Sequence, residues 1–315
     1  MWAAFCCIAY FYSSQQHIPP FIALAFLTAA LIETSLYVAP GFRSMRDAFD
    51  AFDPPVFRAL LLTASAMLPY TVYALGSGTF HWRWFGLIAL LATIASAWFI
   101  VQPKRSEMVD ILFLTFMAGV ALSRVFSRAY VGLSPRVPAE ILGQLMWIRV
   151  GVLSALSFRK LGGVGFGFLP TRKEWNIGVQ QFLLFLPAGA LLAIWLRFAQ
   201  PHAPAGPWWR SIAIGIGTFF GILWVVALSE EFFFRGMLQS TLARLTRSRW
   251  IGLALASLAF GSVHLWFRHF PNWRMALLAA VAGVFYGIAY QRAKAIRASM
   301  VAHALVVTMW RMFFA

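Results

Sequence analysis

The fold is decided by residues 211–241, SIAIGIGTFFGILWVVALSEEFFFRGMLQST. The first two thirds of this run are almost continuously apolar, without the alternation of polar and apolar positions that a half-buried strand shows. About 20 consecutive apolar residues are enough for an α-helix to cross the hydrocarbon core of a bilayer. The run therefore predicts a transmembrane helix, and one that carries several charged side chains.

Apolar runs of the same kind recur along the whole chain, separated by segments rich in proline, glycine and charge. They lie near 20–38, 57–76, 85–101, 108–126, 141–158, 177–197, 211–241, 250–267, 273–291 and 298–314. A shorter run at 2–13 is either an eleventh span or an interfacial segment. The pattern predicts an all-α, polytopic transmembrane helix bundle of about 10–11 spans.

The composition agrees with a membrane location. Of the 315 residues, 61% are hydrophobic and only 11% are charged, and the mean hydropathy is +0.74. A soluble domain has about 25% charged residues, so a cytosolic enzyme, a disordered protein and a conventional nucleic-acid binder are excluded. The net charge of +16 then indicates cytoplasmic loops and lipid headgroups rather than nucleic acid. We expect an integral protein of the cell membrane, with the lipid bilayer as a partner.

Charged residues inside spans are costly and are therefore candidates for function. In the first half of the chain they are Glu33, Asp110 and Arg149, for which we expect mutual pairing or contact with the interface. The run 211–241 is different, because Glu230 and Glu231 are adjacent within it.

At 100° per residue, Glu231 and Arg235 share one face of a helix and can form an ion pair. Glu230 points about 100° away from that face, so the arginine does not neutralise it directly. A buried carboxylate in that position is suited to general-base chemistry, while the Glu231–Arg235 pair anchors the helix. A purely structural ion-pair cluster is the alternative.

Two histidines lie in later spans. Phe260 precedes His264 by one helical turn, so its ring can shield and orient the imidazole, and His303 lies in the last span. Either histidine alone would most simply be an interhelical hydrogen-bonding residue. An unpaired glutamate and two histidines in the last four spans together indicate a functional site.

These motifs, in this order, resemble the CAAX-protease and bacteriocin-processing family (CPBP, Abi), which includes the type II CAAX prenyl endopeptidases. The resemblance covers about residues 165–315, and it divides the chain into an N-terminal transmembrane region of unknown role (1–164) and a protease domain (165–315). The motif residues are Glu230, Glu231 and Arg235, then Phe260 and His264, then His303.

The resemblance implies a glutamate-type intramembrane endopeptidase. Glu230 and His264 would activate a water molecule, His303 would stabilise the oxyanion, and Glu231, Arg235 and Phe260 would support the site. It implies no cofactor and no metal. The substrate would be a membrane-associated protein or peptide, lipidated or C-terminally anchored ones among them. The family often has H-x-x-x-N in its last motif, and here Val307 stands where the asparagine is expected.

Two other classes of protein remain open from the residues alone. A metal-dependent membrane hydrolase could use the same side chains as ligands, although no H-E-x-x-H motif is present. A non-enzymatic transporter or immunity protein could also bury such groups, although transporters often repeat their broken helices in two halves, and this chain does not.

Overall fold

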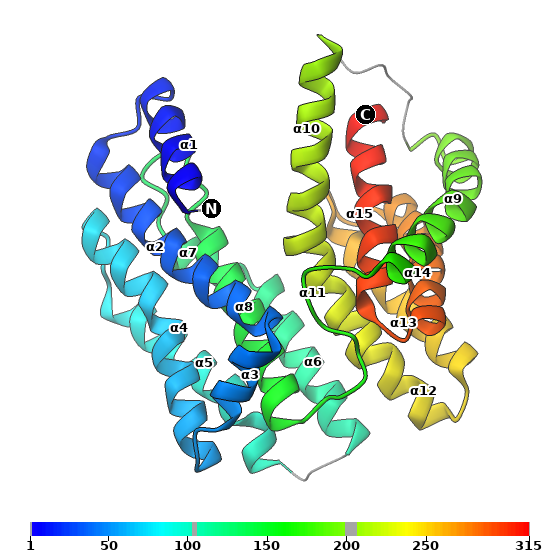
Figure 1. Ribbon diagram of the computed structural model, residues 1–315, viewed down its shortest axis with the longest axis horizontal. Coiled ribbons are helices and arrows are strands. Elements are labelled where there is room, and N and C mark those ends of the chain that lie inside the picture. The colour runs from blue at the N-terminus through cyan, green and yellow to red at the C-terminus, as the bar shows by residue number, and fades with distance from the viewer. Residues whose placement is uncertain (1, 103–105, 199–206, 315) are drawn as a thin grey trace. The chain divides into compact units, whose positions relative to one another are not determined.

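The computed structural model describes residues 2–102, 106–198 and 207–314, and the chain divides into two compact units, 1–161 and 162–315 (Figure 1). The described elements of both units are helical. The expectation of an all-α bundle is therefore confirmed. Each unit is described below by itself.

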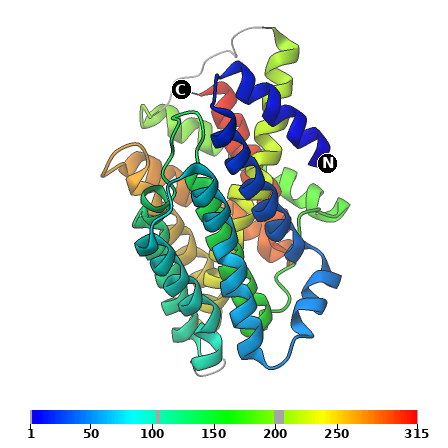
Figure 2. The same cartoon turned by 90° about the vertical axis from the view of Figure 1, so that its left-hand side faces the viewer.

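The first unit is built around α8, its most buried helix, which packs beside α2 and α4 (Figure 2). Proline begins two of its three long helices, as Pro20 in α2 and Pro55 in α4, where its missing N–H leaves no helical bond unmade. The elements are α1 (Trp2–Gln15), α2 (Pro20–Val38), the 3-10 turn η1 (Ala39–Gly41), α3 (Arg43–Asp50), α4 (Pro55–Ser77), α5 (Trp82–Val101), α6 (Glu107–Leu122), α7 (Val125–Ala129), α8 (Glu140–Leu153) and the π-helical η2 (Ser154–Phe158).

The charged residues inside this unit are paired. Arg149 contacts both carboxylate oxygens of Glu33, at 2.9 and 3.0 Å, and donates a further hydrogen bond to the Ser65 hydroxyl. Asp110 accepts two hydrogen bonds from Arg159, at 2.6 and 3.0 Å. The expected pairing is thus confirmed, although the partner of Asp110 is Arg159 rather than Arg149. Such pairing is what allows charges to be buried among apolar helices.

The second unit is built around α14, which contacts α9, α13 and α15. Polar side chains begin several of its helices. Thr171 forms a capping box with Glu174, and Asn272 accepts a hydrogen bond from the Met275 N–H. The elements are α9 (Arg172–Trp195), α10 (Trp208–Gly221), the π-helical η3 (Ile222–Ala227), α11 (Leu228–Glu231), the π-helical η4 (Phe232–Gln239), α12 (Ser240–Thr246), α13 (Arg249–Val263), the 3-10 turn η5 (His264–Trp266), α14 (Trp273–Ala293) and α15 (Ile296–Phe313).

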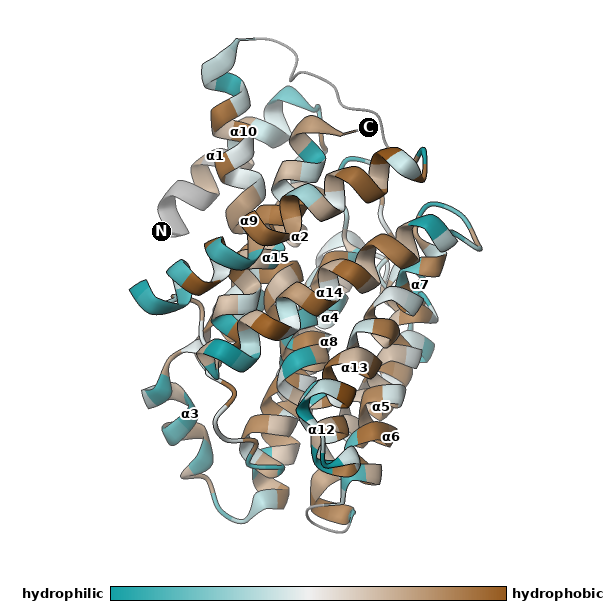
Figure 3. Ribbon diagram, turned by 90° about the vertical axis from the view of Figure 1, so that its right-hand side faces the viewer, coloured by the Kyte–Doolittle hydropathy of each residue, from teal (hydrophilic) through white to brown (hydrophobic). Residues whose placement is uncertain are grey.

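In the described parts of the chain, seven helical stretches are long and apolar enough to cross a membrane. Hydrophobic residues run along the helices of the second unit, and hydrophilic ones occur near α12 and at other helix ends (Figure 3). The seven stretches are Pro20–Gly41, Pro55–Ser77, Trp82–Val101, Glu140–Phe158, Arg172–Trp195, Trp208–Thr246 and Trp273–Ala293.

This number is lower than the expected 10–11 spans. The runs at 108–126 and 250–267 form α6 and α13, which have only 16 and 15 residues. Arg124 adopts a left-handed conformation (φ 56°), so the first of these runs does not continue as one helix. The run at 298–314 forms α15, whose charged and imidazole side chains lower its hydropathy, and the run at 2–13 forms the 14-residue α1.

Candidate active site

The two adjacent glutamates lie on one long helical stretch, Trp208–Thr246, that is not a regular α-helix throughout. Only a single turn, α11, is α-helical around them, and it lies between the π-helical segments η3 and η4. Wider π turns inside helices often occur at functional sites. The sequence analysis assumed one regular helix here, and nothing in the apolar pattern marks the change of pitch.

Glu231 is the buried anchor of the site. Its side chain and that of Arg235 are both fully buried, and Glu231 Oε2 lies 3.2 Å from Arg235 Nε, close enough for an ion pair but not aligned as a hydrogen bond. Arg235 also donates to the Gly283 carbonyl at 3.2 Å, and its guanidinium lies 4.5 Å from the centre of the Phe260 ring. The expected Glu231–Arg235 pair is present, and Phe260 contributes to it a cation–π contact.

Glu230 is placed differently from its neighbour. Its side chain is 31% exposed and lines a cavity, and its Oε2 atom is 3.8 Å from His303 Nε2. That oxygen is enclosed and makes no hydrogen bond to any described residue. Glu230 is therefore the carboxylate that remains available for chemistry, while Glu231 is committed to its partners.

His264 does not lie inside a helix, contrary to the expected span 250–267. α13 ends at Val263, and His264 begins the 3-10 turn η5, which leads through Arg268 in a left-handed conformation to α14. His264 Nδ1 is 2.8 Å from the Phe260 carbonyl oxygen, and the two rings are 4.8 Å apart. Because a carbonyl only accepts, Nδ1 carries the proton, and Nε2 of the neutral ring is left free to accept one.

His303 is held on three sides. Its Nδ1 is 2.8 Å from Glu231 Oε1, its ring stacks in parallel on Tyr286 at 4.7 Å, and the Phe260 ring meets it edge-on at 5.8 Å. Since Glu231 also faces Arg235, this carboxylate is ionised, and it accepts a hydrogen bond from the Nδ1–H group of His303. The ring is thereby oriented with Nε2 directed towards Glu230.

One cavity of about 540 Å³ joins these groups. Glu230, His264 and His303 all line it, so the structure brings together three side chains that are distant in the sequence. Val307, which stands at the expected asparagine position, also lines the cavity and offers no hydrogen bond. The remaining walls are mostly apolar, with Phe182, Leu186, Ile222, Val226, Leu278 and Val306 among them.

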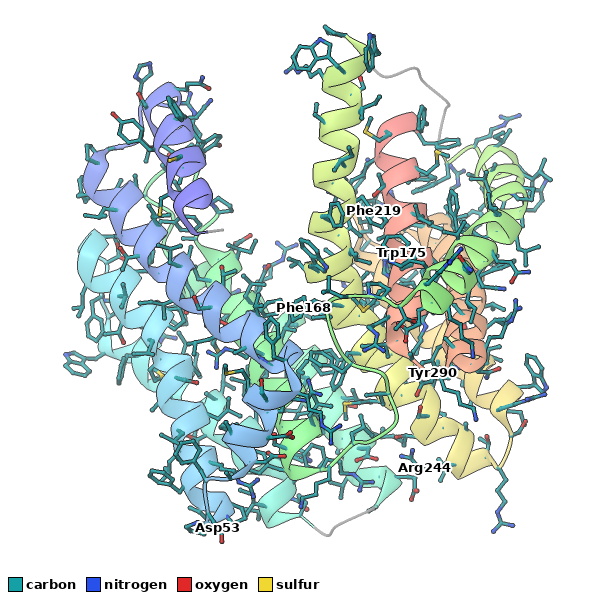
Figure 4. The ribbon with its side chains drawn as sticks, viewed as in Figure 1. Asp53, Phe168, Trp175, Phe219, Arg244 and Tyr290 are labelled. Carbon is teal, nitrogen blue, oxygen red and sulfur yellow. The ribbon has the colours of Figure 1, made fainter. Side chains whose placement is uncertain are left out.

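The start of α9 and the segment before it contact both α15, which carries His303, and η3, which precedes the two glutamates. Arg297, near the start of α15, contacts both oxygens of Glu174, at 2.7 and 2.9 Å. The Ile296 N–H donates to the Val164 carbonyl at 2.8 Å. Phe168 lies on the same segment (Figure 4), and its carbonyl accepts a hydrogen bond of 2.9 Å from Trp224 in η3.

Sequence reasoning missed two groups of this site. One is the Glu174–Arg297 pair. The pattern Thr171-x-x-Glu174 indicates the start of a helix, but it gives no information about which residue pairs with Glu174. The other is Tyr286, a polar aromatic residue inside a predicted span. It packs on His303 only because α14 lies against α15, and no local pattern reveals that contact.

An all-helical protein with membrane-length helices, and with a carboxylate and two imidazoles in an apolar cavity, has the features of a membrane-embedded hydrolase. Residues 211–309 match the family model described as type II CAAX prenyl endopeptidase Rce1-like. This match contains all three motifs and confirms the resemblance to the CAAX-protease family. The match covers about a third of the chain and supports, at the level of the family, a CAAX-type intramembrane protease. The seven long apolar stretches in the described residues support an integral membrane protein. No match was found among curated proteins or among solved structures.

Proposed function

We propose that this protein is a glutamate-type intramembrane endopeptidase that hydrolyses a peptide bond of a membrane-associated protein or peptide. The observation that carries the proposal is the shared cavity, where Glu230 lies beside His303 and His264 lines the same, mostly apolar wall. The substrates considered are lipidated or C-terminally anchored proteins and peptides. The division into a 1–164 region and a 165–315 protease domain belongs to the same proposal.

In the proposed first step, Glu230 and His264 activate a water molecule in the cavity. The water oxygen attacks the carbonyl carbon of the scissile amide, and its proton passes to the Glu230 carboxylate. The bare Nε2 of His264 accepts a hydrogen bond from the same water and orients it. In the second step the C–N bond breaks, and the proton moves from Glu230 to the departing amine. Glu230 thus ends in its starting form.

His303 would stabilise the negative charge on the carbonyl oxygen. The Nδ1–H group of His303 already donates a hydrogen bond to Glu231. Only the doubly protonated ring therefore has a second N–H group, at Nε2, to donate to the oxyanion. A positively charged His303 balances the charge of the cluster. The carboxylates of Glu230 and Glu231 are then matched by two positive charges, on Arg235 and His303. A charge-balanced cluster is the arrangement that an apolar interior tolerates. Glu231, Arg235 and Phe260 support the site by holding His303 and His264 in place.

The test is cleavage by the purified, liposome-reconstituted chain of a farnesylated peptide and of a membrane-anchored peptide without a lipid. Glu230→Gln should abolish cleavage, whereas Glu140→Gln, at an exposed position of the first unit, should leave it unchanged. Wild-type activity in Glu230→Gln would refute the proposed mechanism.

The same preparation separates the two other classes. In the described residues, no group of three or more His, Cys, Asp and Glu side chains is placed to hold a metal ion. Activity lost to chelators, together with metal retained in stoichiometric amount, would replace the proposed mechanism by a metal-dependent one. Substrate flux into liposomes without cleavage of either peptide would indicate a transporter.

A further inference from the structure

The cavity has one donor fewer than the family pattern provides. A tetrahedral intermediate is best stabilised by several hydrogen-bond donors aimed at its oxyanion. Val307 contributes no donor. Thr308 does not line the cavity, and its hydroxyl is enclosed in the protein without a partner. The other donors of α15 that line the cavity are Trp310 and Arg311, which lie about 10 and 12 Å along the helix from His303. A donor close to His303 must therefore come from another helix, or His303 acts alone.

Tyr286 is a hydroxyl-bearing side chain that stacks on the His303 ring from a neighbouring helix. It lies on α14, its ring is within 10° of parallel to the imidazole, and the ring centres are 4.7 Å apart. Tyr286 also lines the cavity with Glu230 and His264. Trp310 lines it too, but lies about 10 Å further along α15 from His303.

The hydroxyl group of Tyr286 is free. It makes no hydrogen bond to any described residue, although the side chain is only 2% exposed, and a buried tyrosine hydroxyl usually has a partner. In contrast to the hydroxyl of Tyr130, which is enclosed and has no partner, the Tyr286 hydroxyl is not fully enclosed by protein. Its remaining exposure is therefore to the cavity that the residue lines.

We propose that the Tyr286 hydroxyl is the second oxyanion donor, replacing the asparagine for which this chain has Val307. The inference rests on the proposed endopeptidase function and adds a catalytic residue to it. A neutral phenol can donate its proton to the oxyanion without being ionised, because free tyrosine loses its proton only near pH 10. In the tetrahedral intermediate the negative oxygen then accepts from Tyr286 and from His303 Nε2, and both bonds weaken when the carbonyl re-forms.

The test compares Tyr286→Phe with Tyr290→Phe in the reconstituted cleavage assay. Tyr286→Phe keeps the ring on His303 and removes only the hydroxyl, so we expect kcat to fall by about 10²–10³ with KM unchanged. Tyr290 is the matched control, one turn later on α14, because its hydroxyl is bonded to Ser240 at 3.0 Å and it does not line the cavity. Its phenylalanine variant should keep kcat.

A second variant distinguishes a lost donor from a disturbed fold. Val307→Asn in the Tyr286→Phe background restores a donor to the cavity wall and should recover at least tenfold in kcat. Undiminished kcat in Tyr286→Phe, or an equal loss in both tyrosine variants, would overturn the inference. Failure of Tyr286→Phe to fold would also overturn it, because the hydroxyl would then have a partner in the protein. Inactivity of the wild-type chain on every peptide would instead count against the proposed function.

Discussion

Replacing Arg297 by alanine should slow cleavage although the residue is not in the cavity. Arg297 lies six residues before His303 on α15, about 9 Å along the helix axis. Its guanidinium contacts both oxygens of Glu174 and the Phe166 carbonyl. These bonds fix the beginning of α15 to α9 and to the segment before it. We therefore expect the substitution to change where α15 presents His303.

The magnitude follows from the geometry of the pair. Hydrogen bonds to charged groups contribute about 1.5–3 kcal/mol each to stability, and there are two, at 2.7 and 2.9 Å. The Arg297 side chain is 22% exposed and that of Glu174 is 8% exposed, so solvent screens part of the interaction. We expect a loss of about 2–3 kcal/mol in the free energy of unfolding for Arg297→Ala. A displacement of His303 by about 1 Å would lower kcat by about 10².

The assay measures kcat and KM in liposomes and the free energy of unfolding in mixed detergent. Arg297→Lys keeps the charge but not the two parallel bonds, so its kcat should be intermediate. Arg159→Ala is the control, since it breaks a similar pair with Asp110 in the first unit. That variant should lose comparable stability and keep kcat. Equal losses of kcat in both alanine variants, or an unchanged kcat in Arg297→Ala, would refute the reasoning.

Two further substitutions test the interior of the second unit. Glu231→Ala leaves Arg235 buried without a carboxylate and should cost about 3–5 kcal/mol in chemical unfolding, whereas Glu231→Gln should cost less because it keeps the side-chain volume. A loss below about 1 kcal/mol would show that the pair is not buried as described. Gly178→Val should also destabilise, by about 1–3 kcal/mol, because even a Cβ atom there would lie 2.6 Å from Val301 Cβ. Gly217→Val is its control, with open space around the glycine, and similar melting of the two variants would contradict the predicted packing of α9 on α15.

The candidate site was only partly readable from the sequence. The helical spacing of Glu231 and Arg235 predicted their ion pair, and the one-turn spacing of Phe260 and His264 predicted their contact. Both depend only on residues four positions apart, which stay neighbours although the helix changes type between them. The position of His264 at a helix end was not predicted, since the apolar run continues beyond Val263 through Leu265, Trp266 and Phe267.

The sequence by itself determined that this chain is a helical membrane protein, because hydropathy and length are properties of each segment alone. It also singled out the ionisable residues, since charge inside an apolar run is rare. Helical spacing already indicated that Glu231 pairs with Arg235, but only the tertiary structure decided which residue completes that pair and which glutamate faces the cavity. That choice depends on His303, 72 positions further along the chain, whose Nδ1 binds Glu231 and whose Nε2 is directed towards Glu230. Contacts of this kind arise from helices packing against one another, and periodicity within one helix carries no information about them.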